Sequence, residues 1–296
     1  MIRPVSRVKV GTGLLVLYGL GVMLQAQQPP AQSPAPLPQL VKVADELYVI
    51  QNLNHTVAEI GQNGGNVTVI VTSEGAILVD SKNERMHEDI VAKVKSVTAQ
   101  PIRYMVLTHN HGDHSGGSAR LQAAGVMVVS SIASRDNMAR TNAPGRAPIA
   151  YSGYAELSLG GKRLALREFR GHTKGDTVIT LPAARTVIAG DLVTTPETIP
   201  TIVNYADGGN WTELGQSLDA IAKMDFDVLI AGHGPNLTKA EFIRYRDRTT
   251  AIRERFRALN RERKTQEEIA QTLVQEFNWG TGPAAGNLAG MMQELR

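Results

Sequence analysis

The 296-residue sequence contains no cysteine and only 5% aromatic residues. The absence of cysteine excludes a thiolate metal ligand, a redox Cys-x-x-Cys pair, a cysteine nucleophile and lipoprotein processing. A transition-metal site in this chain must therefore be built from histidine and carboxylate side chains. The sequence also lacks a Gly-x-Ser-x-Gly motif, so it offers no serine nucleophile elbow. It has no internal repeat of the length that indicates a solenoid or a propeller.

An excess of basic residues is confined to the N-terminus. The whole chain has 31 Lys and Arg against 28 Asp and Glu, and residues 1–26 hold Arg3, Arg7 and Lys9 with no acidic residue. Without that segment the balance is 28 against 28. The sequence pI near 9.1 is therefore no argument for a nucleic-acid partner. With 42% hydrophobic and 20% charged residues, the remaining chain can bury one sizeable core.

Residues 1–26 have the pattern of a signal peptide. Three positive charges precede an apolar run, 10–24, and a cleavage site is expected after Ala26. The run has about 15 residues, fewer than the roughly 20 that span a bilayer, so cleavage is favoured over an uncleaved anchor helix. A Pro-rich linker is predicted for 27–40. We expect a periplasmic or secreted protein whose only membrane contact is the signal segment before cleavage.

Hydrophobic periodicity predicts strands and helices in alternation after residue 40. Strands are predicted at 45–50, 101–109, 125–131 and 227–234, and hairpins at 66–80, 154–171 and 176–191. Helices are predicted at 83–97, 116–124, 211–224, 238–260 and 265–277, the last two opened by capping boxes. The pattern of 280–296 is weak and predicts a frayed end. This order indicates an α/β layered fold with mixed sheets, with a domain over 41–240 and a helical extension over 241–296.

Metal-binding residue types follow the apolar strands at their carboxyl ends. The residues in these positions are His109, His111, Asp113, His114, His172, Asp191 and His233. Five of the seven histidines of the chain lie at these positions, and adjoining glycines such as Gly232 allow tight turns and close approach. Neutral imidazole and carboxylate are the ligands that suit Zn²⁺ when thiolate is absent. Seven donors are more than the four ligands that one tetrahedral ion takes, so the pattern predicts two zinc ions per chain that share a carboxylate.

The sequence resembles the metallo-β-lactamase fold superfamily of hydrolases from about residue 41 to about residue 240. The motifs that carry the resemblance are THNHGDHSGG (108–117), GHTKGD (171–176), IAGD (188–191) and AGHG (231–234). The resemblance implies an αββα sandwich of two mixed sheets flanked by helices, with the metals at one edge. It also implies ligand roles: His109, His111 and His172 for the first metal, and Asp113, His114 and His233 for the second. Asp191 would bridge both.

The residue at position 191 bears on the branch of the family. In β-lactamases of this superfamily a Cys or Ser usually stands there, whereas a bridging Asp resembles thioesterases, lactonases, phosphodiesterases and sulfatases. His111 favours hydrolysis, since redox di-iron relatives commonly carry Glu at that position. Persulfide-oxidising iron relatives share the histidine motif, so the metal is left open.

The sequence thus predicts an exported dinuclear zinc hydrolase, in which a metal-bound hydroxide attacks an ester, thioester, lactone or lactam carbonyl of a small molecule. Asp113 is the candidate catalytic residue, because it could orient the hydroxide or move its proton. Alternatives are a β-lactamase acting on β-lactam antibiotics, a mononuclear iron oxidoreductase and a metal-binding protein without turnover. Two long segments, 52–66 and 192–211, are the candidate specificity loops. His55, Asn204 and Tyr205 in these segments are candidate substrate contacts.

Overall fold

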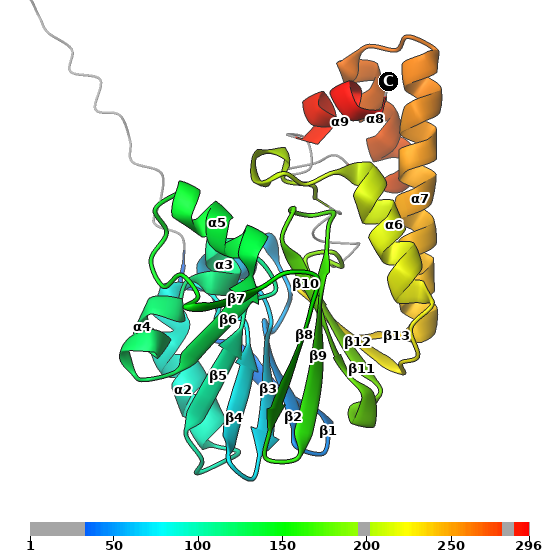
Figure 1. Cartoon of the computed structure of the whole chain (residues 1–296). Coiled ribbons are helices and arrows are strands. Elements are labelled where there is room, and N and C mark those ends of the chain that lie inside the picture. Colours follow the sequence, from blue (N-terminus) through cyan, green and yellow to red (C-terminus); the bar gives the residue numbers. More distant parts are fainter. Residues whose placement is uncertain (1–32, 195–201, 280–286, 296) are drawn as a thin grey trace, which may run out of the picture. The chain divides into compact units, whose positions relative to one another are not determined.

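The computed structural model describes residues 33–194, 202–279 and 287–295 (Figure 1). The signal peptide predicted at 1–26 and the first part of the predicted linker lie outside these residues. In the described part of the chain, no helix combines the length and the apolar character that crossing a membrane requires.

Seven strands form the first sheet in the order in which they occur along the chain. They are β1 (Gln39–Ala44), β2 (Leu47–Gln51), β3 (Val67–Thr72), β4 (Gly75–Val79), β5 (Ile102–Val106), β6 (Met127–Ser131) and β7 (Ile149–Tyr151). The strands β1 to β4 pair antiparallel, and β4 to β7 pair parallel. The carboxyl ends of β4, β5, β6 and β7 therefore meet at one edge of this sheet.

The second sheet has six strands in the order β13-β12-β11-β10-β9-β8. They are β8 (Tyr154–Leu159), β9 (Lys162–Phe169), β10 (Asp176–Leu181), β11 (Thr186–Gly190), β12 (Val228–Ala231) and β13 (Leu237–Thr238). The pair β11 and β12 is parallel, and the other neighbours are antiparallel. Loops that follow β11 and β12 thus leave the sheet at the same edge.

Helices cover the outer face of each sheet (Figure 1). The α-helices are α1 (Val57–Asn63), α2 (His87–Lys95), α3 (Gly112–Ser115), α4 (Ser118–Ala123), α5 (Ile132–Arg140), α6 (Trp211–Ala222), α7 (Lys239–Arg261), α8 (Gln266–Phe277) and α9 (Leu288–Glu294). Short 3₁₀ turns are η1 (Glu84–Met86), η2 (Pro182–Ala184) and η3 (Tyr205–Asp207). A core cluster that includes Ile90 of α2 lies on the first sheet, and one that includes Trp211 and Phe242 lies on the second. The layers are αββα, as the resemblance implied.

The central core lies between the two sheets. It joins Ile77 and Val106 of the first sheet to Leu166, Ile179 and Ile188 of the second, all of them buried. These residues alternate along their strands with residues that face the helices, which is the period-2 pattern of a strand with both faces covered. Because the two sheets pack face to face, the loops at the carboxyl ends of β5, β11 and β12 lie close together at one edge of the sandwich.

The structure confirms the three predicted hairpins and the main helices of the domain. The capping boxes of Thr238 with Glu241 and of Thr265 with Glu268 are formed at the starts of α7 and α8. The prediction of a frayed C-terminus was wrong for Leu288–Glu294, which form α9 with Leu288 and Met291 buried. These two side chains enter the core on the second sheet, and that tertiary burial outweighs the weak local pattern.

The central core should carry much of the stability. Replacing Ile77, fully buried between the sheets, by Ala should lower the free energy of unfolding by about 2–5 kcal/mol, because the removed methylenes leave a cavity. Ile149→Ala makes the same chemical change at a side chain that is 46% exposed and should cost within about 0.5 kcal/mol. Denaturant unfolding with excess chelator measures both. Equal losses in the two variants would contradict this assignment of the core.

Candidate metal centre

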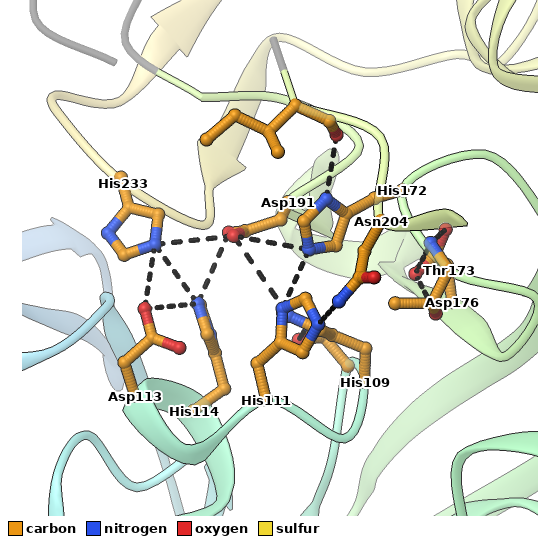
Figure 2. A network of polar contacts seen from close by, with 12 residues as sticks. His109, His111, Asp113, His114, His172, Thr173, Asp176, Asp191, Asn204 and His233 are labelled. Atoms are coloured by element: carbon orange, nitrogen blue, oxygen red, sulfur yellow. Dashed lines mark hydrogen bonds and ion pairs between the residues drawn. The ribbon is translucent and has the colours of Figure 1, made fainter. Parts of the chain in front are cut away.

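Four loops bring seven histidine and aspartate side chains together at the shared edge of the two sheets (Figure 2). His109, His111, Asp113 and His114 lie between β5 and α4, the last two on α3. His172 lies between β9 and β10, Asp191 follows β11 directly, and His233 follows β12 after Gly232. The structure therefore brings together all seven residues that the sequence singled out as metal ligands.

The seven side chains form two groups of candidate metal ligands. One group is His109, His111, His172 and Asp191, and the other is Asp113, His114 and His233. Within each group, one candidate ligand atom from every residue lies within 4.8 Å of the others. This division matches the first and second metal of the resemblance.

Asp191 lies between the two groups. Its Oδ1 is 3.2 Å from His114 Nε2, and its Oδ2 is 3.3 Å from His233 Nε2. The same Oδ2 is 3.6 Å from His172 Nε2 and 4.0 Å from His109 Nε2. One carboxylate is thus within reach of nitrogen ligands from both groups, which is the arrangement that a bridging ligand needs.

Hydrogen bonds outside the cluster fix the proton of each ring in the first group. His172 Nδ1 is 2.8 Å from the Ile202 carbonyl oxygen, which can only accept, so Nε2 keeps its lone pair. His111 Nε2 is 3.0 Å from Asp207 Oδ2 and 2.8 Å from the Asn204 amide nitrogen. The charge-assisted bond to the carboxylate is the stronger one, so Nε2 carries the proton and Nδ1 keeps its lone pair.

Asp80, at the end of β4, fixes two further rings. Its Oδ2 accepts from His114 Nδ1 at 2.8 Å and from Thr108 Oγ1 at 2.7 Å. Because the Thr108 hydroxyl donates its proton to Asp80, its oxygen accepts a hydrogen bond from His109 Nδ1 at 3.1 Å. His109 is left with an Nε2 lone pair that faces the cluster, and His114 Nε2 lies 3.2 Å from Asp191 Oδ1.

The chemistry and spacing of the donor atoms in the cluster fit metal ions. His172 Nε2 and His111 Nδ1 are 2.9 Å apart with a lone pair on each, so they need a cation beside them. Within the described ranges, His109 Nε2 is buried and has no hydrogen-bond partner. Ligands at 2.0–2.1 Å from a tetrahedral zinc lie about 3.3–3.4 Å from one another, close to the 3.2 Å between His114 Nε2 and His233 Nε2.

Burial and charge separate the pKa values within the cluster. Burial lowers the pKa of His172 to about 4 and puts the pKa of His109 well below its usual range, so both rings are neutral. Burial also acts against charge on His233, but the carboxylates of Asp191 and Asp113 raise its pKa to about 9. Despite burial, the neighbouring histidines lower the pKa of Asp113 and of Asp191, which are therefore ionised. Two ionised carboxylates beside the neutral rings of His109 and His172 form a site that attracts cations.

Two glycines allow the cluster to close. A Cβ on Gly232 would lie 1.9 Å from Asp191 Oδ1, and one on Gly65 would lie 2.2 Å from His114 Cε1. Lys82 holds the backbone at Gly65, since its buried Nζ donates a hydrogen bond to the Gly65 carbonyl at 2.5 Å. The cluster is most open at His111 and Asp113, whose side chains are 23% and 29% exposed.

The candidate substrate contacts have other partners or remain untested. Besides His111, the Asn204 amide contacts Asp207, and the Tyr205 hydroxyl donates to Glu294 Oε2 at 3.0 Å. Asn204 therefore donates to Asp207, the carboxylate that orients His111, and Tyr205 is tied to α9. His55 precedes α1 with φ of 55°, and burial lowers its pKa. Substrate contact by His55 stays a prediction.

Sequence reasoning missed Asp80 and Asp207, the carboxylates that orient the ligands. Asp80 carries the same signal as the ligands, a carboxylate at the end of an apolar strand, and could have been found by it. Asp207 carries no such signal, because it lies in the 3₁₀ turn η3 and reaches His111 only through the folding of residues 202–207.

Replacing Asp80 by Asn should weaken zinc binding by about 10–100-fold, because His114 and Thr108 lose the carboxylate that orders them. Competition with a colorimetric chelator measures this affinity. Asp136→Asn changes an exposed carboxylate of α5 in the same way and should leave it unchanged. An affinity equal to that of the wild type in Asp80→Asn would exclude a positioning role for Asp80.

Lys82→Met should stabilise the protein near pH 7. Burial lowers the pKa of Lys82 from its usual 10.5 to about 7, so between these values the unfolded chain binds a proton that the folded chain does not. The contribution of Lys82 to stability therefore rises with pH, by up to about 1.4 kcal/mol per pH unit.

The stability difference between Lys82→Met and the wild type should thus shrink from pH 7 to pH 10 in denaturant unfolding. Lys223→Met, at an exposed position, should show no such slope. A difference that does not change with pH in Lys82→Met would show that the buried ammonium keeps its proton.

Comparisons with known proteins agree with this geometry. The family model of the metallo-beta-lactamase superfamily matches residues 60–233, which is more than half of the chain. A metallo-beta-lactamase type 2 of Bacillus cereus is 24% identical over 173 residues, which cover 57% of this chain and 66% of that relative. The matched part thus spans just under two thirds of the relative's length.

Solved structures show the same fold. A metallo-beta-lactamase from Pontibacter korlensis superposes with a TM-score of 0.63 at 22% identity, covering 72% of this chain and 99% of that one. A metallo-beta-lactamase from Pseudomonas aeruginosa, in a mono-zinc form, gives 0.63 at 22% identity, covering 75% and 98%. The matched motifs, the αββα layers and the His/Asp cluster lead to one conclusion: the chain belongs to the metallo-beta-lactamase superfamily.

Proposed function

We propose that this chain is an exported, dinuclear zinc-dependent hydrolase that opens an ester, thioester, lactone or lactam bond of a small molecule. The observation that carries the proposal is the position of Asp191, whose two oxygens are 3.2 Å and 3.3 Å from His114 Nε2 and His233 Nε2 and also face His172. A site for a single ion needs no carboxylate shared by two groups of ligands.

The two groups of side chains would each hold one ion. His109, His111 and His172 would hold the first, Asp113, His114 and His233 would hold the second, and Asp191 would be the ligand that the two ions share. Zinc bound in this way would supply Lewis acidity for a carbonyl oxygen and would lower the pKa of a bound water. The neutral state of His109 and His172 suits them to this role without loss of a proton.

Asp113 is suited to orient the attacking water. Its carboxylate is ionised, 3.2 Å from His233 Nε2, and more exposed than the other members of its group. It can therefore accept a hydrogen bond from a water on the open side of the cluster, where a substrate enters. Bond cleavage without a side-chain nucleophile agrees with the absence of a serine elbow and of cysteine.

Hydrolysis of β-lactams is the second candidate function, and the names of the relatives favour it. The Bacillus cereus protein and the two solved structures are metallo-beta-lactamases. Asp191 argues against it, because the β-lactamases of this superfamily usually have Cys or Ser at that position. A chromogenic cephalosporin therefore belongs among the test substrates.

Export is proposed on residues 1–26 alone. Their three positive charges and their apolar run have the order of a signal peptide. Because the rest of the chain is formally neutral, we propose a small molecule as the partner and no nucleic acid.

Elemental analysis of the purified full chain should give about two zinc per chain. The protein should turn over one member of a panel that contains a chromogenic cephalosporin, a lactone, a thioester and a phosphodiester. Asp191→Ala should lose at least one zinc and should lower turnover by more than about 100-fold, because both ligand groups lose their shared carboxylate.

Asp45→Ala is the matched control, since it removes a carboxylate whose side chain is almost fully exposed. It should keep both metals and full turnover. One iron per chain without hydrolysis of any substrate would overturn the proposal and would favour the iron oxidoreductase.

A further inference from the structure

Residues 202–207 supply the hydrogen-bond acceptors for two ligands of the first metal. The Ile202 carbonyl accepts from His172 Nδ1 at 2.8 Å, and Asp207 Oδ2 accepts from His111 Nε2 at 3.0 Å. The third ligand of this metal, His109, relies instead on Thr108. The two rings oriented by 202–207 thus depend on how this one segment is held.

Helix α9 contacts this segment at three points. Asn287 Oδ1, at the start of α9, accepts from the Val203 amide at 2.8 Å, and Glu294 Oε2, at its end, accepts from the Tyr205 hydroxyl at 3.0 Å. Between them, Gly290 lies against the Tyr205 ring, so closely that a Cβ would be 2.2 Å from Tyr205 Cε2. The contacts cover the residues on both sides of Asn204.

Glu294 also binds the start of α6, which follows segment 202–207 in the chain. Its two oxygens accept from the Trp211 and Thr212 amides, each at 2.8 Å, and from the Thr212 hydroxyl at 2.7 Å. These amides are the unpaired donors of the first turn of α6, where a carboxylate is favoured. One side chain of α9 therefore joins Tyr205 to the start of α6.

The opposite side of the segment is anchored on α5. Asn137 Nδ2 donates to the Asp207 carbonyl at 3.1 Å, and the Arg140 guanidinium donates to the Asp207 carboxylate. Segment 202–207 is thus held between α5 and α9. Loss of either anchor would free the acceptors of His111 and His172 to move.

We infer that α9 is a positioning element for the first metal, acting through segment 202–207 on His111 and His172 and leaving the second metal unaffected. The inference rests on the proposed two-metal site. His114, a ligand of the second metal, is ordered elsewhere, by Asp80 at the end of β4.

Two variants of α9 test this inference in the zinc-loaded full chain. Glu294→Gln removes the charge that joins Tyr205 to α6, and Gly290→Ala adds a methyl group against the Tyr205 ring. Alanine is the better helix former, so any weakening in Gly290→Ala comes from this clash and not from the helix itself. The matched control is Glu276→Gln on α8, which breaks an exposed ion pair with Arg255.

Competition with a chelator should resolve two zinc dissociation constants. In both α9 variants one constant should rise about 10-fold while the other stays within about twofold. NMR of ¹⁵N-histidine-labelled protein identifies the site: the N–H signals of His111 and His172 should broaden or vanish, and that of His114 should remain. Glu276→Gln should match the wild type in both measurements.

Two results would overturn the inference. One is a pair of zinc constants that do not change in either variant. The other is an equal weakening of both sites with loss of the His114 signal, which would indicate general loosening of the fold. Failure of the proposed function is distinguishable, because the unmutated chain would then bind fewer than two zinc ions.

Discussion

The position of the proton on each imidazole ring decides what the cluster can bind. Four acceptors outside the cluster hold a proton of four of the five rings: the Ile202 carbonyl, the Asp207 and Asp80 carboxylates and the Thr108 hydroxyl. Each takes an N–H of its ring and so turns the opposite ring nitrogen toward the cluster. Without this ordering, the rings could exchange hydrogen bonds among themselves and would not form a set of lone pairs directed at a cation.

This arrangement buries the ionised carboxylate of Asp191 next to the neutral rings of His109 and His172, which costs free energy. Asp191 is 7% exposed, and the groups nearest to it are histidines. A buried charge is stabilising only when it is paired. In the proposed state two zinc ions provide the pairing, so metal binding and folding of this edge are coupled. The buried core between the sheets stabilises the fold and fixes the loops that carry the ligands, and this stabilisation offsets the unfavourable burial of the carboxylate.

Sequence alone predicted the ligand set because each ligand lies in the segment that follows an apolar strand. The strand signal and the residue type together identified His172, Asp191 and His233, although they are far apart along the chain. The sequence did not predict α5, whose residues are mostly polar and whose buried side chains include Ser134 and Asn137. Helix α1 was also missed, although its capping box of Thr56 and Glu59 is visible in the sequence.

The outer contacts could not be predicted, because they depend on tertiary packing. Asp207 meets His111 across 96 positions of sequence, and Glu294 meets Tyr205 across 89. No local pattern connects such residues, and the weak periodicity of the C-terminus concealed α9. The ligands are thus a local property of strand ends, whereas their orientation is a property of the whole packed fold.

Segment 202–207 has two roles that cannot be separated. It orders His111 and His172 from outside, and it borders the open side of the cluster, because His111 is one of its two partly exposed members. A change in this segment that reshapes the approach of a substrate will also move an acceptor of a ligand. If the proposed two-metal site is correct, substrate choice and affinity for the first metal would therefore be coupled, and α9 would act on both through its contacts with Val203 and Tyr205.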